Sequence, residues 1–302
     1  MSHSHSSYKK LWFVFFLSLF YMIAEILGGI WSGSLALLAD AGHMAIDTAG
    51  IALGLFAMWI SSKPPTSKKT YGYYRAEILA ALLNGVFLLA ISIWIVMEAW
   101  NRFSHPEPVQ GNVMSWIAFG GLMVNVIGVK LLHAHSHDSL NMRGVWLHLI
   151  SDLLGSVSAM IAGFLVWKWG WTIADTVSSL IISVFICVGA WRLVSEAVHV
   201  LLEGVPARID TEKIKTALEQ VPGVRGVFDL HIWQVATGIP ALSCHVAVAK
   251  EFSHPEMLRV LSQLLENEFS ISHSTLQLEP EGFHQGSEHP NHCELKPHGH
   301  DR

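Results

Sequence analysis

Six long apolar stretches occupy the first two thirds of the chain and limit strongly what it can fold into. Each is long enough to cross a hydrocarbon core of about 30 Å as a helix, which takes about 20 residues. Lipid offers no partners to backbone polar groups, so each stretch is expected to form a helix. The stretches are Leu11–Trp31, Leu35–Ile60, Ile78–Trp100, Val113–His133, Trp146–Val166 and Ile173–Leu202. We therefore predict an α-helical membrane protein with six transmembrane helices.

The composition supports a membrane protein and excludes other classes. Of 302 residues, 51% are hydrophobic and 14% are charged, against about 25% charged in soluble domains. A net charge of −5 gives no sign of a nucleic-acid partner. Cys187, Cys244 and Cys293 lie far apart without a CxxC pair, so neither a disulfide framework nor a zinc ribbon is predicted. The first stretch lacks a small-residue cleavage site and is too long for a signal peptide.

Basic residues predict how the chain crosses the membrane. Lysines and arginines gather before the first stretch, after the second and after the fourth, whereas the opposite side carries little beyond Arg102 and Lys168. By the positive-inside rule, both termini are expected in the cytoplasm, and the tryptophans of residues 167–171 at the outer interface. The sequence contains no long loop or targeting segment. We therefore expect a bacterial inner membrane.

The pattern changes after Pro206. A helix is expected from Asp210 to Val221, two strands over 226–235 and 241–249, a second helix over Pro255–Phe269 and a third strand over Thr275–Glu279. This order predicts a small αββαβ, ferredoxin-like cytoplasmic domain. Residues 281–302 are rich in His, Pro and Gly, a composition typical of disorder. The predicted divisions are a His-containing N-terminus at 1–10, the helices at 11–204, the αββαβ domain at 205–280 and the tail at 281–302.

Two HxxxD pairs lie inside apolar stretches. A charged side chain at the membrane centre costs at least about 2.5–3.5 kcal/mol on insertion scales, so each one needs a reason. His43 with Asp47, and His148 with Asp152, are four residues apart and so share a helix face. One pair alone would indicate a hydrogen bond within a helix. Two pairs favour a tetrahedral site of two imidazoles and two carboxylates, which suits Zn²⁺.

Charge balance makes such a site suitable for exchange. Two aspartates and one divalent cation are neutral together, which an apolar interior tolerates better than bare carboxylates. When the metal leaves, the same groups are expected to take up protons. Asp40 either supports the metal ligands or faces water at the outer end. The other buried polar candidates are predicted to form interhelical hydrogen bonds; they are Glu25, Asn84, Asn125 and Asp175.

Three segments resemble the cation diffusion facilitator family, in particular its zinc, cadmium and cobalt exporters. They are GSLALLADAGH at 33–43, YGYYRAE at 71–77 and LEGVP at 202–206. The resemblance implies a Y- or V-shaped homodimer with the αββαβ domain in the cytoplasm. It also implies that the transport site exchanges Zn²⁺ for H⁺ by alternating access, and that its two histidines favour zinc. The implied ligands of this site are His43, Asp47, His148 and Asp152.

The resemblance also implies contacts outside the transport site. His231, His245 and Glu279 match a regulatory zinc site near the dimer interface, although Gln277 stands where a relative has His. A solvated sheet face with two histidines is the alternative. Arg75 and Glu203 match a basic–acidic interlock, where partial desolvation would make an unpaired charge costly. An extra metal site of some relatives is expected to be absent, because residues 61–76 contain neither His nor Asp and Tyr73 replaces a His.

A short histidine run follows the fourth apolar stretch, on the predicted cytoplasmic side. It consists of His133, His135 and His137, and further histidines lie at both ends of the chain. Flexible histidine tracts bind metal loosely, because the chain loses entropy when it orders around the ion. We expect these residues to concentrate metal near the protein and not to act as transport ligands.

These features predict a proton-coupled antiporter that exports Zn²⁺, with Cd²⁺ and Co²⁺ as further candidates, and not an enzyme. Its expected partners are divalent metal ions, protons, membrane lipid and a second copy of the chain. The alternatives are an intramembrane zinc metalloenzyme and a membrane-anchored metal sensor. The chain lacks an HExxH motif, and four protein ligands would leave no open position on the metal for a substrate. Paired ionisable groups inside the membrane disfavour a sensor that uses its helices only as an anchor.

Overall fold

The computed structural model describes residues 2–133, 140–236 and 238–282, and gives the backbone alone for residues 2–15, 51, 55, 132–133 and 140–151. Two compact units divide the chain: Met1–Phe56 with Ala80–Val194, and Ala57–Leu79 with Ser195–Arg302. We call them the helical unit and the C-terminal unit. The C-terminal unit thus includes the ends of three long helices and the loop over residues 62–74.

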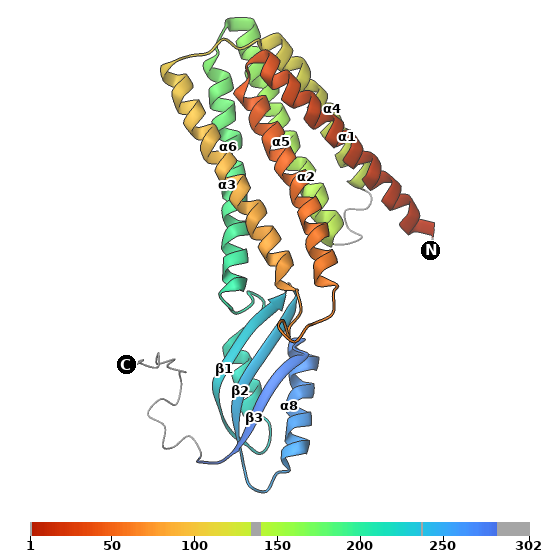
Figure 1. The fold of residues 1–302 in the computed structure, drawn as a ribbon, viewed down its shortest axis with the longest axis vertical. Coiled ribbons are helices and arrows are strands. Elements are labelled where there is room, and N and C mark those ends of the chain that lie inside the picture. The colour runs from red at the N-terminus through yellow and green to blue at the C-terminus, as the bar shows by residue number, and fades with distance from the viewer. Residues whose placement is uncertain (1, 134–139, 237, 283–302) are drawn as a thin grey trace. The chain divides into compact units, whose positions relative to one another are not determined.

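Within the described ranges, six long helices precede the β-strands and cover the six predicted stretches, except that Leu202 lies just beyond α6. Over the described residues, α2, α3, α4 as far as Leu131, and α6 are long and apolar enough to cross a membrane, and α1 contributes a shorter apolar run. Within the helical unit, α4 packs along α5 and α1 packs along α4 (Figure 1). The helices are α1 (Ser2–Ser32), α2 (Leu35–Ser61), α3 (Arg75–Ser104), α4 (Gly111–His133), α5 (Leu140–Trp169) and α6 (Ile173–Leu201).

Small residues, serines and some larger apolar residues such as Ile95 and Met114 fill the interior of the helical unit, while many large apolar side chains point outward. Buried Ala36, Ala118 and Ala159 let helices approach closely. Outward-facing residues include Phe185 and Trp191. This distribution is typical of helices packed in lipid, where apolar surface has no reason to be buried. Polar contacts join the helices; Asn125 Nδ2 of α4 donates to Ser156 Oγ of α5 at 3.1 Å, and the hydroxyls of Ser158 and Ser178 lie 2.9 Å apart.

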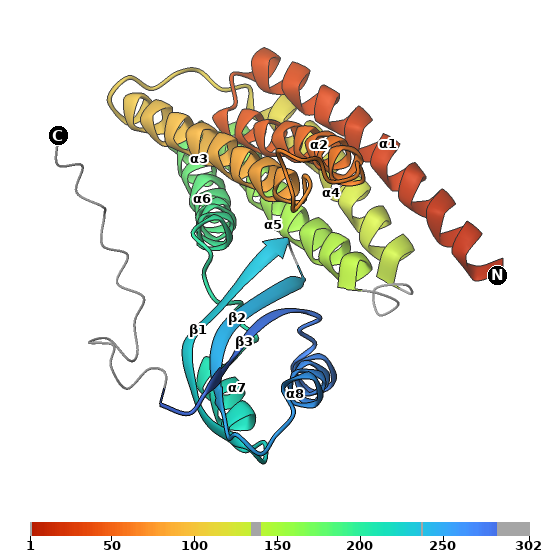
Figure 2. The ribbon, with the colours of Figure 1, turned by 60° about the horizontal axis from the view of Figure 1, so that its bottom comes forward.

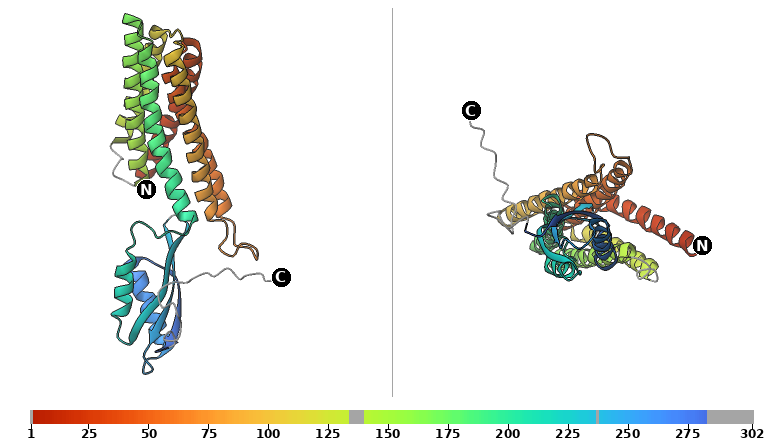
Figure 3. Two further views of the ribbon diagram at one scale, coloured as in Figure 1. Left: turned by 90° about the vertical axis from the view of Figure 1, so that its left-hand side faces the viewer. Right: turned by 90° about the horizontal axis from the view of Figure 1, so that it is seen from below.

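The C-terminal unit has the predicted αββαβ order. Helix α7 (Thr211–Glu219) begins after Asp210, whose carboxylate accepts from the backbone N–H groups of Glu212 and Lys213. Strand β1 pairs antiparallel with β2, and β2 pairs parallel with β3. Figures 2 and 3 show both helices on one face of this mixed sheet. The remaining elements are β1 (Val224–Ala236), β2 (Ile239–Val248), α8 (His254–Phe269) and β3 (His273–Pro280).

Apolar residues of both helices and the sheet form one core between them. Ile214 and Leu218 of α7 and Leu261 and Leu265 of α8 are fully buried, and Val246 of β2 is fully buried opposite them. Their spacing of four residues places each pair on one helix face. The side chains on the other face of the sheet, including His245 and Glu279, lie outside this core.

Candidate metal centre

The HxxxD pair of α2 and the aspartate of α5 converge inside the helical unit. His43 and Asp47 stand one turn apart on α2, and His43 Nε2 lies 3.4 Å from Asp47 Oδ2. The same nitrogen lies 3.9 Å from Asp152 Oδ1. Asp152 is buried, and His43 and Asp47 are 20% and 23% exposed. His148 lies one turn before Asp152 on α5, but its side chain is outside the described residues.

These separations are close to those of a tetrahedral metal site. Two ligand atoms that each lie 2.0–2.1 Å from a tetrahedral zinc ion are about 3.3–3.4 Å apart. The pair on α2 has this spacing, whereas the contact from His43 to Asp152 is longer. Among the described side chains, no group of three or more His, Cys, Asp and Glu residues is arranged to hold a metal ion.

A cavity of about 330 Å³ lies beside these residues. Asp40, His43 and Asp152 supply charge or hydrogen bonding to it, and the remaining wall is mostly apolar. A carboxylate or imidazole in such a wall is poorly hydrated, which strengthens its attraction to a cation. The other lining residues come from α3, α5 and α6: Leu88, Leu154, Gly155, Ser158, Ile181, Ile182, Phe185, Ile186, Gly189 and Ala190.

Buried polar groups of α1 and α2 lie at and near this cavity. Asp40 is 3% exposed, so it does not face water. A Cβ on Gly155 would lie 3.5 Å from Asp40 Oδ1, so the backbone of α5 passes close to this carboxylate. On α1, the Tyr21 hydroxyl donates to Glu25 Oε1 and also lies 3.2 Å from the carbonyl oxygen of Ile117 on α4. The expected interhelical bond of Glu25 is present as a side-chain hydrogen bond to Asp40 of α2, beside the bond from Tyr21 on its own helix.

The predicted interlock is present as an exposed ion pair in the C-terminal unit. Arg75 Nη2 at the start of α3 donates to Glu203 Oε1 at 2.9 Å. Arg75 is 40% exposed and Glu203 is 61% exposed, so both charges keep much of their contact with water. Both residues line a cavity of about 1060 Å³ that the basic loop before α3 and the sheet residue His231 also line.

The sheet brings together two of the three residues of the predicted cytoplasmic site. His245 Nδ1 of β2 lies 2.7 Å from Glu279 Oε1 of β3, and Gln277 Nε2 donates to the same oxygen at 2.7 Å. His231 is exposed, and its Nε2 instead contacts Asp229 Oδ1 at 3.0 Å. Strand β1 has an irregularity between Phe228 and His231.

The backbone of Asp229 has a positive φ of 50°, which interrupts the two-residue alternation of a strand. His231 consequently pairs with Ser243, and Phe228 pairs with His245. Cys244 of β2 is 2% exposed, and this burial raises the pKa of its thiol to about 12.

The histidine run and the tail lie mostly outside the described residues. His133 ends α4, while His135, His137 and residues 283–302 are not described. Within residues 61–76 the sequence offers no His or Asp, and the described contacts of Tyr73 include a cation–π contact with Lys69 at 4.5 Å.

Comparison with known proteins identifies the family. Residues 11–202 match the cation efflux transmembrane domain, and residues 206–281 match the cation efflux protein cytoplasmic domain. The zinc transporter ZitB of Escherichia coli (strain K12) is 39% identical over 300 residues, covering 96% of each chain. The cadmium, cobalt and zinc/H(+)-K(+) antiporter of Bacillus subtilis (strain 168) is 38% identical over 289 residues, covering 93% of each.

A third relative is the metal cation efflux system protein CzcD of Cupriavidus metallidurans, 38% identical over 261 residues that cover 86% of this chain and 82% of CzcD. A solved structure of the metal-bound C-terminal domain of CzcD is 36% identical, with a TM-score of 0.22, and covers 24% of this chain and 99% of that domain. The family and these relatives are transporters and not enzymes, so the metalloenzyme alternative is wrong. The chain belongs to the cation efflux family.

Proposed function

We propose that this protein is a proton-coupled antiporter that exports Zn²⁺ from the cytoplasm, with Cd²⁺ and Co²⁺ as further cargo. The observation that carries the proposal is the convergence of His43, Asp47 and Asp152 beside a cavity in the helical unit. His148, one turn from Asp152, is the proposed fourth ligand. The names of the relatives, a zinc transporter and a cadmium, cobalt and zinc antiporter, agree with this cargo.

The chemistry of these ligands explains the exchange. A divalent cation neutralises the two carboxylates, so the loaded site carries little net charge through an apolar interior. Without the cation, close carboxylates repel each other and favour protonation. Metal and protons therefore compete for the same groups, and zinc binding is expected to weaken as the cytoplasmic pH falls. Alternating access of this one site to the two sides would couple export of metal to import of protons.

The experiment measures zinc and proton flux in reconstituted vesicles loaded with a zinc dye and a pH dye. Asp47→Asn and Asp152→Asn keep the side-chain size and remove one ligand charge each. We expect both to lose zinc-driven flux of both ions. Asp210→Asn, an aspartate at the start of α7, is the matched control and is expected to transport like the parent. Parental zinc flux in either membrane variant would refute the site.

We further propose that His245 and Glu279, together with His231, bind regulatory Zn²⁺ and favour a homodimer. The 2.7 Å contact between His245 and Glu279 supports the first two ligands, and His231 would have to leave Asp229 to join them. A ligand that binds one assembly state better must favour that state. His245→Ala should weaken zinc-dependent dimer compaction, measured by small-angle scattering, while transport continues. Complete loss of flux with intact metal binding in the membrane would contradict a regulatory role.

The proposed function also includes a membrane orientation and a role for the histidine-rich segments. Both termini lie in the cytoplasm of a bacterial cell, and the protein resides in the inner membrane. The run His133, His135 and His137, together with the tail over 281–302, concentrates zinc on that side. Thiol labelling of single cysteines placed at residue 2 and in the tail, on intact and opened cells, tests the orientation. Labelling in intact cells would contradict it.

A further inference from the structure

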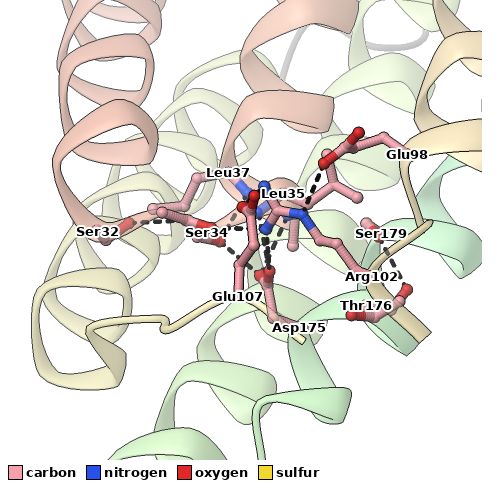
Figure 4. Close-up of polar contacts among 12 residues, drawn as sticks. Ser32, Ser34, Leu35, Leu37, Glu98, Arg102, Glu107, Asp175, Thr176 and Ser179 are labelled. Carbon is pink, nitrogen blue, oxygen red and sulfur yellow. Dashed lines mark hydrogen bonds and ion pairs between the residues drawn. The ribbon is translucent and has the colours of Figure 1, made fainter. Parts of the chain in front are cut away.

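A buried carboxylate of α6 holds the start of the helix that carries His43 and Asp47. Asp175 is fully buried in the first turn of α6. Its Oδ1 accepts from Ser34 Oγ at 2.6 Å, and its Oδ2 accepts from the backbone N–H of Leu35 at 2.8 Å (Figure 4). The backbone N–H of Ala36 adds a bond of 3.2 Å to Oδ1.

These contacts make Asp175 a helix cap supplied from another helix. The first N–H groups of any helix lack partners within it and carry partial positive charge, so a carboxylate there is favourable. Ser34, the residue before α2, caps locally as well, because its Oγ accepts from the backbone N–H of Leu37 at 3.2 Å. The axial position of α2 is thereby fixed to α6.

Arg102 of α3 attaches the turn before α2 to the same cluster. Its Nη1 donates to the carbonyl oxygen of Gly33 at 2.7 Å and lies 3.7 Å from Asp175 Oδ2. Its remaining nitrogens contact Glu98 Oε1 at 3.1 Å and Glu107 Oε2 at 2.9 Å. Arg102 is 8% exposed, so it neutralises Asp175 away from water. Three helices thus meet at the start of α2.

The anchored end and the ligands belong to one continuous helix. His43 and Asp47 follow Leu35 by eight and twelve residues, so they lie about 12 Å and 18 Å along α2. A shift or rotation at the anchored end therefore moves both ligands relative to Asp152 on α5. Metal sites tolerate displacements of only about 0.5 Å. The same α6 that bears Asp175 also forms part of the wall of the cavity, through Ile182 and Ile186.

We propose that Asp175 is a positioning residue for cation binding: by capping α2 it sets the height and rotation at which His43 and Asp47 face Asp152. This inference rests on the proposed function of that site. Asp175 itself touches no cargo. It acts through the backbone of α2, and Arg102 supports it through Gly33.

The test measures metal binding to the purified full-length protein in detergent. Asp175→Asn keeps the side-chain size but replaces one acceptor oxygen with an N–H donor facing the N–H groups of α2. The Kd for Zn²⁺ is expected to rise between about 2-fold and 30-fold, the range for residues that act through a packed element. The visible spectrum of bound Co²⁺ is expected to change as well, because it reports ligand geometry. Asp210→Asn, at the start of α7 and outside this cluster, is the matched control and should behave like the parent.

A second variant covers the case in which Asp175→Asn does not fold. Ser34→Ala removes one of the three donors to Asp175 and leaves the two backbone donors in place, so a smaller rise in Kd is expected. Parental Kd values and Co²⁺ spectra for every folded variant of Asp175 and Ser34 would overturn the inference. Failure of the proposed function is distinguishable, because it would appear as parental zinc binding by Asp47→Asn.

Discussion

Charge reversal at the ion pair between Arg75 and Glu203 tests how much an exposed interlock contributes to stability. The relevant proteins are the parent, Arg75→Glu, Glu203→Arg and the double variant that swaps the charges. The two groups are joined at 2.9 Å and are 40% and 61% exposed. Water therefore surrounds both, and the attraction between them is strongly screened.

The expected magnitude follows from this exposure. Two unit charges about 4 Å apart attract by about 1 kcal/mol in bulk water, and measured exposed pairs contribute about 0.2–1 kcal/mol. We expect a coupling free energy below about 1 kcal/mol, falling toward zero in 1 M NaCl, where the screening length is about 3 Å. Breaking the buried contact of Arg102 with Asp175 is different, since removing one partner of a buried pair costs about 3–5 kcal/mol.

The assay is a double-mutant cycle of unfolding free energies for the detergent-solubilised protein at low salt and in 1 M NaCl. Each single reversal should destabilise slightly, and the swap should recover most of the loss. A coupling above about 2 kcal/mol, or one that 1 M salt leaves unchanged, would refute the reasoning from exposure.

Three further perturbations test the site and the C-terminal unit. His43→Asp keeps four ligands but replaces nitrogen with oxygen, so calorimetric titration should show affinity shifting from Zn²⁺ toward Cd²⁺ or Mn²⁺; an unchanged order of metals contradicts this. Leu261→Ala empties a fully buried position and should cost about 2–5 kcal/mol of unfolding free energy, whereas the exposed Leu258→Ala should cost less than about 0.5 kcal/mol. Because burial raises the pKa of Cys244 to about 12, the native state keeps a proton that the unfolded thiol loses from about pH 8.5. Stability should fall above that pH, by about 2 kcal/mol at pH 10, and Cys244→Ala should lack this fall; equal pH profiles would contradict it.

The sequence alone predicted the order of the elements, because length and periodicity are local properties. The six apolar stretches and the αββαβ pattern both correspond to elements of the structure. The helix ends differ, since apolar content marks only the part of a helix that faces lipid. Helix α5 begins at Leu140 and not near Trp146, and α3 begins at Arg75 and not near Ile78.

The sequence also predicted which residues of one helix act together. Spacing of four residues places His43 beside Asp47, and their 3.4 Å contact follows directly. The strand β1 shows the limit of such reasoning. Asp229 adopts a positive φ that is unusual for a residue other than glycine, so the simple alternation missed the irregularity that pairs His231 with Ser243.

Only the tertiary structure decided which distant groups meet. The sequence predicted that Asp175 is a buried polar residue and that Arg102 lies on the outer side of the membrane. It did not predict which residue either of them contacts. The structure joins them at the start of α2, where Asp175 accepts from Leu35 across 140 positions of chain. A buried carboxylate must find donors and a counter-charge, but local spacing cannot say which helix end supplies them. That choice is made when the helices pack.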